Sequence, residues 1–194
     1  MKTKILLGLC VLFTMHNAHS ANNAVTFEEN NSLPIVYVNV TLSAGSANDP
    51  QSKLGLTNLA SQMLLRGTQT RDKLAFFEAL NQLGAQLEVE VRNEGTIFRG
   101  AVLAANLQPF LELVEETLTK PKFTAGELIK LKKEIESQIL IQKSRDQQLA
   151  AYHFLRFFYG THPYGNPITG TRRGVNAITS KDVSDFYSEN FGAN

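Results

Sequence analysis

The order of strand and helix patterns along the chain is the feature that most restricts its fold. Residues 36–42 alternate apolar with more polar side chains, a period of two that predicts a strand with one buried face. Two helical patterns follow, and residues 87–104 then alternate again around Asn93-Glu94-Gly95, which indicates a β-hairpin. Helical patterns occupy most of the chain after residue 104. This order predicts an α+β fold, with an antiparallel-rich sheet covered by helices on one face.

The predicted helices are bounded by residues that start or stop helices. Gly67 and Gly84 end the first two, and Pro121 follows the third. Thr124-Ala-Gly-Glu127 predicts a capping box at the start of a long helix. The expected helical ranges are 54–65, 72–83, 107–118, 124–144, 148–159 and 180–189, with a short edge strand at 24–27.

Two of these helices carry apolar residues that we expect in the core. Residues of helix 72–83 that form its expected apolar stripe are Leu74, Phe77, Leu80 and Leu83. The aromatic residues expected in the core from helix 148–159 are Phe154, Phe157, Phe158 and Tyr159.

The first twenty residues have the layout of a secretory signal peptide. Lys2 and Lys4 precede the apolar run Ile5–Phe13, which is too short to span a bilayer, and Ala18-His19-Ser20 offers small residues for cleavage. We therefore expect residues 1–20 to be removed and residues 21–194 to form a single domain. An uncleaved anchor and a lipoprotein at Cys10 remain alternatives.

The composition limits which cellular compartment and which classes of binding partner we expect for this protein. Cys10 is the only cysteine, so the mature domain is expected to have neither a disulfide nor thiol chemistry, as suits a bacterial periplasm or a secreted protein. The formal net charge of +1 gives no electrostatic reason to expect nucleic acid or stable insertion into a membrane.

The segment Gly55–Thr68, GLTNLASQMLLRGT, has the frame of a zinc-protease helix without its zinc ligands. A helix places positions i, i+3 and i+4 on one face, and here these are Asn58, Ser61 and Gln62. An inverted zincin needs His-x-x-Glu-His at this spacing, to hold the metal and to activate its water. Two amides and a hydroxyl suit neither task.

Several motifs in the same order resemble the pitrilysin/insulinase family of zinc peptidases, especially its secreted bacterial members and the mitochondrial processing peptidase. The matching motifs are Leu33-Pro34, Ala44-Gly45-Ser46, Gly55–Thr68, Leu83-Gly84-Ala85, Pro121-Lys-Phe123 and HPYGNPITGT at His162–Thr171. The resemblance implies a LuxS/processing-peptidase-like α+β domain that is usually present twice in a longer chain. The sequence is similar to the N-terminal half, ending before its last strand and without the C-terminal half.

The resemblance also implies where the zinc site would lie. The two ligand histidines fall on Asn58 and Gln62, and the catalytic glutamate falls on Ser61. The third ligand falls on Gln138, with Ser137 as the neighbouring option. We expect no catalytic residue and no bound zinc at these degenerate positions.

Other residues leave alternatives open. A small shift of alignment brings Glu134 or Glu136 to the third-ligand position. His153 and His162 are the histidines left after signal cleavage, and a displaced metal site would need them. We expect His153 at a core boundary and His162 in a turn. A nucleophilic Ser61 would need a base, and the sequence offers none nearby.

These observations lead to a functional hypothesis with two alternatives. The leading hypothesis is a catalytically inactive member of the family that binds peptide and pairs with an active homologous subunit or with itself. The first alternative is an active metallopeptidase with displaced ligands. The second is a stand-alone peptide-binding module.

Overall fold

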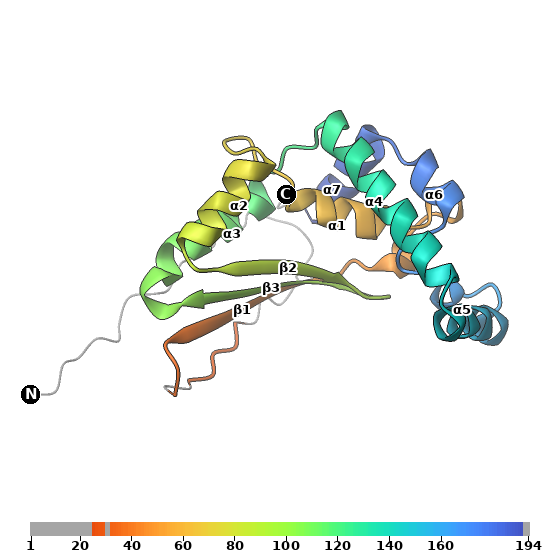
Figure 1. Ribbon diagram of the computed structural model, residues 1–194, viewed down its shortest axis with the longest axis horizontal. Helices are drawn as coiled ribbons and strands as arrows, with labels where there is room; N and C mark the ends of the chain where they lie inside the picture. The colour runs from red at the N-terminus through yellow and green to blue at the C-terminus, as the bar shows by residue number, and fades with distance from the viewer. Residues whose placement is uncertain (1–24, 30–31, 192–194) are drawn as a thin grey trace, which may run out of the picture.

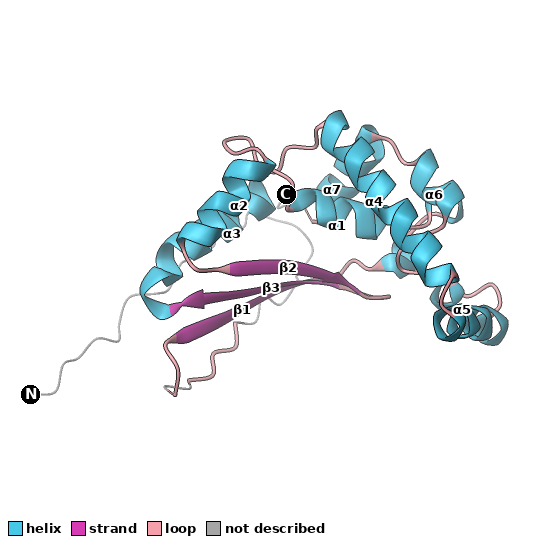
Figure 2. Ribbon diagram, viewed as in Figure 1, coloured by secondary structure: helices cyan, strands magenta, loops and turns pink. Residues whose placement is uncertain are grey.

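The computed structural model describes residues 25–29 and 32–191. Its elements follow the predicted order of strand, two helices, hairpin and further helices (Figures 1 and 2). They are β1 (Ile35–Leu42), α1 (Leu56–Leu64), α2 (Lys73–Gln82), β2 (Gln86–Val91), β3 (Thr96–Leu103), α3 (Leu107–Thr119), α4 (Ala125–Lys143), α5 (Asp146–Tyr159), the 3-10 turn η4 (Pro163–Gly165), α6 (Arg172–Ala177) and α7 (Ser180–Asn190).

The sheet has the strand order β1-β3-β2, and both pairings are antiparallel. Residues alternate in burial along β3: Phe98 and Val102 are buried, whereas Arg99 and Leu103 are exposed. Helices α2 and α3 pack over the buried face (Figure 1). The predicted α+β fold with one covered sheet face is therefore confirmed.

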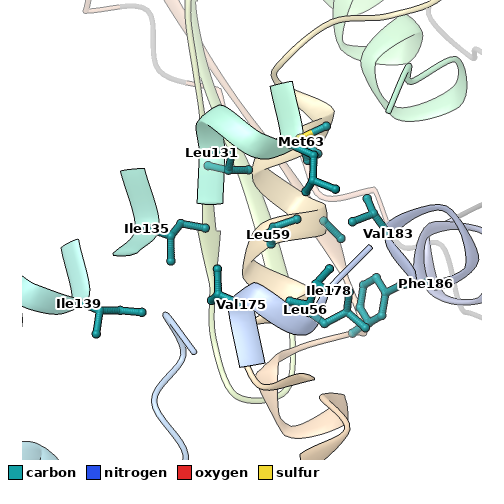
Figure 3. Close-up of a cluster of buried hydrophobic side chains, with 13 residues drawn as sticks. Leu56, Leu59, Met63, Leu131, Ile135, Ile139, Val175, Ile178, Val183 and Phe186 are labelled. Carbon is teal, nitrogen blue, oxygen red and sulfur yellow. The ribbon is translucent and has the colours of Figure 1, made fainter. Parts of the chain in front are cut away.

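The buried side chains form two clusters. One lies between the sheet and helices α2 and α3, and includes Phe76, Phe98 and Phe110. The other joins α1, α4, α6 and α7 (Figure 3). Along the contact between α1 and α4 in Figure 3, the labelled residues run in opposite directions: Met63, Leu59 and Leu56 in α1; Leu131, Ile135 and Ile139 in α4. The two helices are thus antiparallel neighbours.

Several expectations about element ends are corrected. Helix α6 was not predicted, because its six residues are too few to show a helical period. Residues 25–27 form no strand. Thr124 caps α4 by accepting from the Glu127 amide, but the Glu127 carboxylate bonds to Arg66 and Lys130, so the capping box is incomplete. The signal peptide and residues 192–194 lie outside the described residues.

The expectation that the aromatic residues of α5 lie in the core was wrong. Phe154, Phe157 and Phe158 are 61%, 88% and 66% exposed, and α5 has no buried residue. The stripe predicted for α2 was wrong in part, since Leu80 is buried with Phe76 while Leu74 is 68% exposed. In both helices, tertiary packing decides which apolar face is covered, and the periodic pattern alone does not.

Candidate functional site

The start of α1 is held by a buried carboxylate. Asp49, which is 8% exposed, accepts hydrogen bonds from the amides of Gly55 (2.7 Å) and Thr57 (2.8 Å) and from the Thr57 hydroxyl (2.6 Å). Burial raises the pKa of Asp49, while these hydrogen bonds act in the opposite direction. Asp49 therefore supplies the cap that Gly55, the N-cap residue, has no side chain to provide.

A close approach of two glycines also fixes where α1 begins. Gly55 has a φ of 100°, and a Cβ there would lie 2.9 Å from the Cα of Gly170. Gly170 has a φ of 82°, and its Cβ would lie 2.3 Å from the carbonyl oxygen of Leu54. Only residues without a side chain fit both backbones at this distance. The loop after HPYG thereby packs directly against the first turn of α1.

The predicted site residues on α1 form a polar pair, of which Asn58 is buried and Gln62 half-buried, and a separate hydroxyl. The Gln62 amide nitrogen Nε2 donates to Asn58 Oδ1 at 2.9 Å, as expected for positions i and i+4 on one helix face. Asn58 is 8% exposed, and its Nδ2 has no hydrogen-bond partner. Ser61 is fully buried, and its hydroxyl donates to the Thr57 carbonyl at 2.7 Å. Ser61 is thus bonded to its own helix rather than to a base.

The predicted third-ligand position lies on the neighbouring helix α4. Gln138 is exposed and precedes Ile139, whose labelled side chain lies towards the Leu56 end of the α1–α4 contact in Figure 3. Glu134 lies one turn earlier, where its carboxylate pairs with the Arg66 guanidinium. Arg66 also pairs with Glu127 at 3.3 Å. The carboxylate of Glu134 is therefore already paired with an arginine charge.

The remaining third-ligand options turn away from α1. Glu136 accepts from the side-chain amide of Asn176 at 2.6 Å and lies 3.8 Å from Arg172, and both of these residues belong to α6. The Ser137 hydroxyl donates to the Lys133 carbonyl within α4. Neither residue can complete a ligand set with Asn58 and Gln62 in this arrangement.

The two histidines among the described residues, His153 and His162, lie on α5 and at the turn that follows it. His153 is exposed, so the expectation of a core boundary was wrong. His162 Nδ1 accepts from the Tyr164 amide at 3.2 Å, in agreement with the predicted role in a turn. The Tyr164 hydroxyl contacts the Glu94 carboxylate at the hairpin tip. This loop therefore links α5 to the hairpin and brings no imidazole to α1.

The donor set does not suit zinc. Protein zinc sites use thiolate, imidazole or carboxylate ligands, and the α1 face offers amide and hydroxyl groups. Among residues 25–29 and 32–191, no three His, Cys, Asp or Glu side chains are grouped closely enough to hold a metal ion. No helix in these ranges is long and apolar enough to cross a membrane.

The family model described as insulinase, peptidase family M16, matches residues 24–172. The chain belongs to the M16 peptidase family. The resemblance seen in the sequence motifs is thereby confirmed.

Relatives of this M16 chain include proteins named as peptidases and as non-peptidases. The non-peptidase homolog YmxG of Helicobacter pylori is 24% identical over 191 residues, covering 98% of this chain and 44% of the relative. A probable mitochondrial-processing peptidase subunit beta of Arabidopsis thaliana is 22% identical, covering 87% of this chain and 32% of the relative. The chain thus spans less than half the length of both relatives.

A solved M16 structure shares the fold. The crystal structure of a peptidase M16 inactive domain from Pseudomonas fluorescens matches with a TM-score of 0.76 and 26% identity. The match covers 81% of this chain and 38% of that chain.

Sequence reasoning found the α1 face but missed the side chains that support it. Asp49 lies in a stretch predicted only as a small polar loop, and nothing local indicates that its carboxylate caps α1. Arg66 follows the end of α1, in the turn before Gly67, and no local pattern marks it as a partner of α4. Its pairing with Glu134 depends on how α1 and α4 pack.

Proposed function

We propose that this chain is a non-catalytic M16 domain that binds extended peptides and pairs with an active homologous peptidase subunit. The observation that carries the proposal is the neutral side chain at every zinc-site position expected on α1, Asn58, Ser61 and Gln62, in a chain that matches the M16 family over residues 24–172. Without the metal-bound water and its base, the groups that lower the barrier to peptide hydrolysis are missing. We therefore expect neither bound zinc nor peptidase activity in the isolated chain.

Peptide binding needs none of the lost groups. Within the described residues, β2 pairs only with β3, so its other edge is available to an added strand. Helix α1, which carries Asn58 and Gln62, packs against β2. An extended peptide that adds to a sheet edge is held by main-chain hydrogen bonds and needs no metal. The preserved edge thus supports a retained binding role.

The partner role is supported by the surface of α5. Phe154, Phe157 and Phe158 project from a helix with no buried residue, and Leu155 beside them is 43% exposed. Large exposed apolar patches are typical of protein–protein contact sites. The relative from Arabidopsis is named as a subunit, which also favours an assembly. We propose that an active homologous subunit covers this face, with a second copy of the chain as the other outcome of the test.

Export is the remaining part of the proposal. The signal-peptide layout of residues 1–20 supports delivery to the periplasm or the medium. The absence of cysteine after residue 20 suits a domain that folds there without disulfides.

The test combines metal analysis with activity measurements. The full-length protein is expressed with its N-terminal segment and purified after export. Its zinc content and its cleavage of a quenched fluorescent peptide are then measured, both alone and with a co-encoded homologue. We expect less than stoichiometric zinc, no cleavage alone, and a change in the cleavage rate of the homologue. Stoichiometric zinc together with cleavage by the isolated chain would refute the proposal and favour displaced ligands.

A ligand-restoring variant provides the matched control. Asn58→His, Ser61→Glu, Gln62→His and Gln138→Glu together rebuild the inverted zincin set on α1 and α4. We expect this variant to bind zinc, while the same variant with Ser137→Glu in place of Gln138→Glu binds it more weakly. Equal zinc binding by the unmodified chain would contradict the assignment of these positions.

A further inference from the structure

A pocket lies where the connection from α1 to α2 meets the connection from α3 to α4. It has a volume of about 270 Å³, and none of Asn58, Ser61 and Gln62 lines it. Its lining residues with ionisable side chains are Arg66, Arg71, Asp72, Lys73, Lys122 and Glu127. Four of these are cationic and two are anionic, so positive charge dominates the lining.

Backbone hydrogen bonds hold the two connections together. The Gln69 amide donates to the Lys120 carbonyl at 2.9 Å, and the Lys122 amide donates to the Gly67 carbonyl at 3.1 Å. The backbone of the pocket is therefore ordered before a ligand arrives, and binding costs less conformational entropy than it would in a flexible loop.

The two arginines of the pocket are held in place by carboxylates. Arg66 pairs with Glu127 at 3.3 Å and with Glu134. Arg71 pairs with Glu116. A guanidinium has five N–H donors, so each arginine keeps donors that a ligand oxygen could use.

The two lysines of the pocket have no acidic partner. Within the described ranges, no carboxylate lies within ion-pair distance of the ammonium group of Lys73 or of Lys122. Lys73 is half-buried and Lys122 is exposed, and each comes from a different one of the two connections. Their charges therefore converge on the pocket from two sides.

The two acids of the pocket are already engaged elsewhere. Glu127 accepts from Lys130 at 2.7 Å, and this contact, together with Arg66, holds the pKa of Glu127 below its usual range. The Asp72 carboxylate accepts from the Ala75 amide at 2.8 Å as the N-cap of α2. The positive charges of the two lysines are thus left without a counter-charge.

We propose that this pocket binds a phosphate group, free or as a small phosphate monoester, through the ammonium groups of Lys73 and Lys122. A phosphate monoester carries about −1.5 to −2 charges at pH 7, which matches two uncompensated lysines. Lysine binds phosphate as a point charge, and arginine donors fit its oxygens. Because a water molecule takes about 30 Å³ in the liquid, the pocket has room for the phosphate and part of the molecule that carries it. This site is separate from the proposed peptide binding and does not depend on it.

The test measures phosphate affinity by isothermal titration calorimetry of the full chain at low ionic strength, where charge interactions are least screened. The probes are inorganic phosphate and glycerol 3-phosphate. We expect Lys73→Gln and Lys122→Gln each to weaken the binding of inorganic phosphate about tenfold, through the loss of one charged hydrogen bond.

Lys181→Gln is the matched control. It removes the same charge from the exposed start of α7, and Lys181 does not line the pocket. Its effect on phosphate affinity should stay below about twofold, because an exposed charge outside the site is screened by solvent and salt.

Thermal unfolding gives a second measurement, because a ligand that binds only the folded chain raises Tm. Phosphate should raise the Tm of the unmodified chain and of Lys181→Gln, and should leave the double variant Lys73→Gln, Lys122→Gln unchanged. Equal affinities for the two probes would support a monoester as the ligand, and binding of inorganic phosphate alone would support the free anion. Absence of binding to the unmodified chain, or equal weakening by Lys181→Gln, would overturn the inference and leave the peptide-binding proposal unaffected.

Discussion

Replacing Asp49 with alanine should unfold the start of α1 and lower the stability of the whole domain. The carboxylate accepts from the backbone amides of Gly55 and Thr57 and from the Thr57 hydroxyl. In Asp49→Ala, two backbone N–H groups at a buried helix start lose their acceptor, and each unpaired group costs about 1–3 kcal/mol. Relief from burying a charge offsets part of this loss, so we expect a net decrease of about 3 kcal/mol.

The expected loss is large compared with the stability of an ordinary domain, which is about 5–15 kcal/mol. For a domain of this size it corresponds to a decrease in Tm of roughly 6–12 °C. Urea unfolding followed by circular dichroism measures the free energy directly. Asp185→Ala is the matched control, because Asp185 forms an exposed pair with Lys181 and its loss should cost less than about 1 kcal/mol.

Asp49→Asn separates the hydrogen bonds from the charge. The amide keeps one acceptor oxygen for Thr57 but turns an NH₂ group towards the Gly55 N–H, so we expect a loss of about 1–2 kcal/mol at neutral pH. Because burial raises the pKa of Asp49 above 3.8, the native state holds this proton more tightly than the unfolded state. The advantage over Asp49→Asn should therefore be greatest below pH 3.8 and decrease as the pH rises through the native pKa. Equal stabilities of Asp49→Ala and Asp185→Ala would refute the role of Asp49 in holding α1.

Three further outcomes follow from named contacts. The Asp182 carboxylate accepts a hydrogen bond from Lys53, which lowers the pKa of Asp182 to about 2. Asp182→Asn should therefore lower the free energy of unfolding by about 1 kcal/mol at pH 7. In urea unfolding this loss should become progressively smaller as the pH falls from 3.8 to 2. Gly170→Ala should lower the urea midpoint severely, because its Cβ would lie 2.3 Å from the Leu54 carbonyl oxygen; a midpoint like that of the unmodified chain would contradict the close approach. Phe157→Ser should change stability by less than about 0.5 kcal/mol, since the ring is 88% exposed, but should weaken association with a homologous subunit in sedimentation velocity; unchanged association would argue against the α5 face.

Local spacing was enough to predict the α1 face. Leu56, Leu59 and Met63 follow the helical period and are buried, so Asn58 and Gln62 had to share one side of the same helix. The same reasoning predicted the hairpin and the sheet, because alternation and a turn are properties of neighbouring residues.

Local spacing could not predict which side chains from distant parts of the sequence contact one another. The open choice among Gln138, Glu134 and Glu136 could not be settled from spacing, since a shift of a few residues along α4 turns a different side chain towards α1. The tertiary structure pairs Glu134 with Arg66 and turns Glu136 towards α6. Arg66 is 68 residues from Glu134 in the sequence, and Asn176 is 40 residues from Glu136, so both partners are set by tertiary packing.

The sequence by itself determined that Asn58, Ser61 and Gln62 lie at helical spacing on α1 of this M16 chain with no imidazole or carboxylate among them, because residue identity at a helical spacing is a local property. Only the tertiary structure decided that Asp49 caps α1, that the rings of α5 are exposed and that Asn58 Nδ2 has no partner. Each of these depends on which distant segment covers a given side chain. Burial and hydrogen-bond pairing arise from packing between elements, and neither the periodicity of apolar residues nor helix and strand propensity predicts that packing.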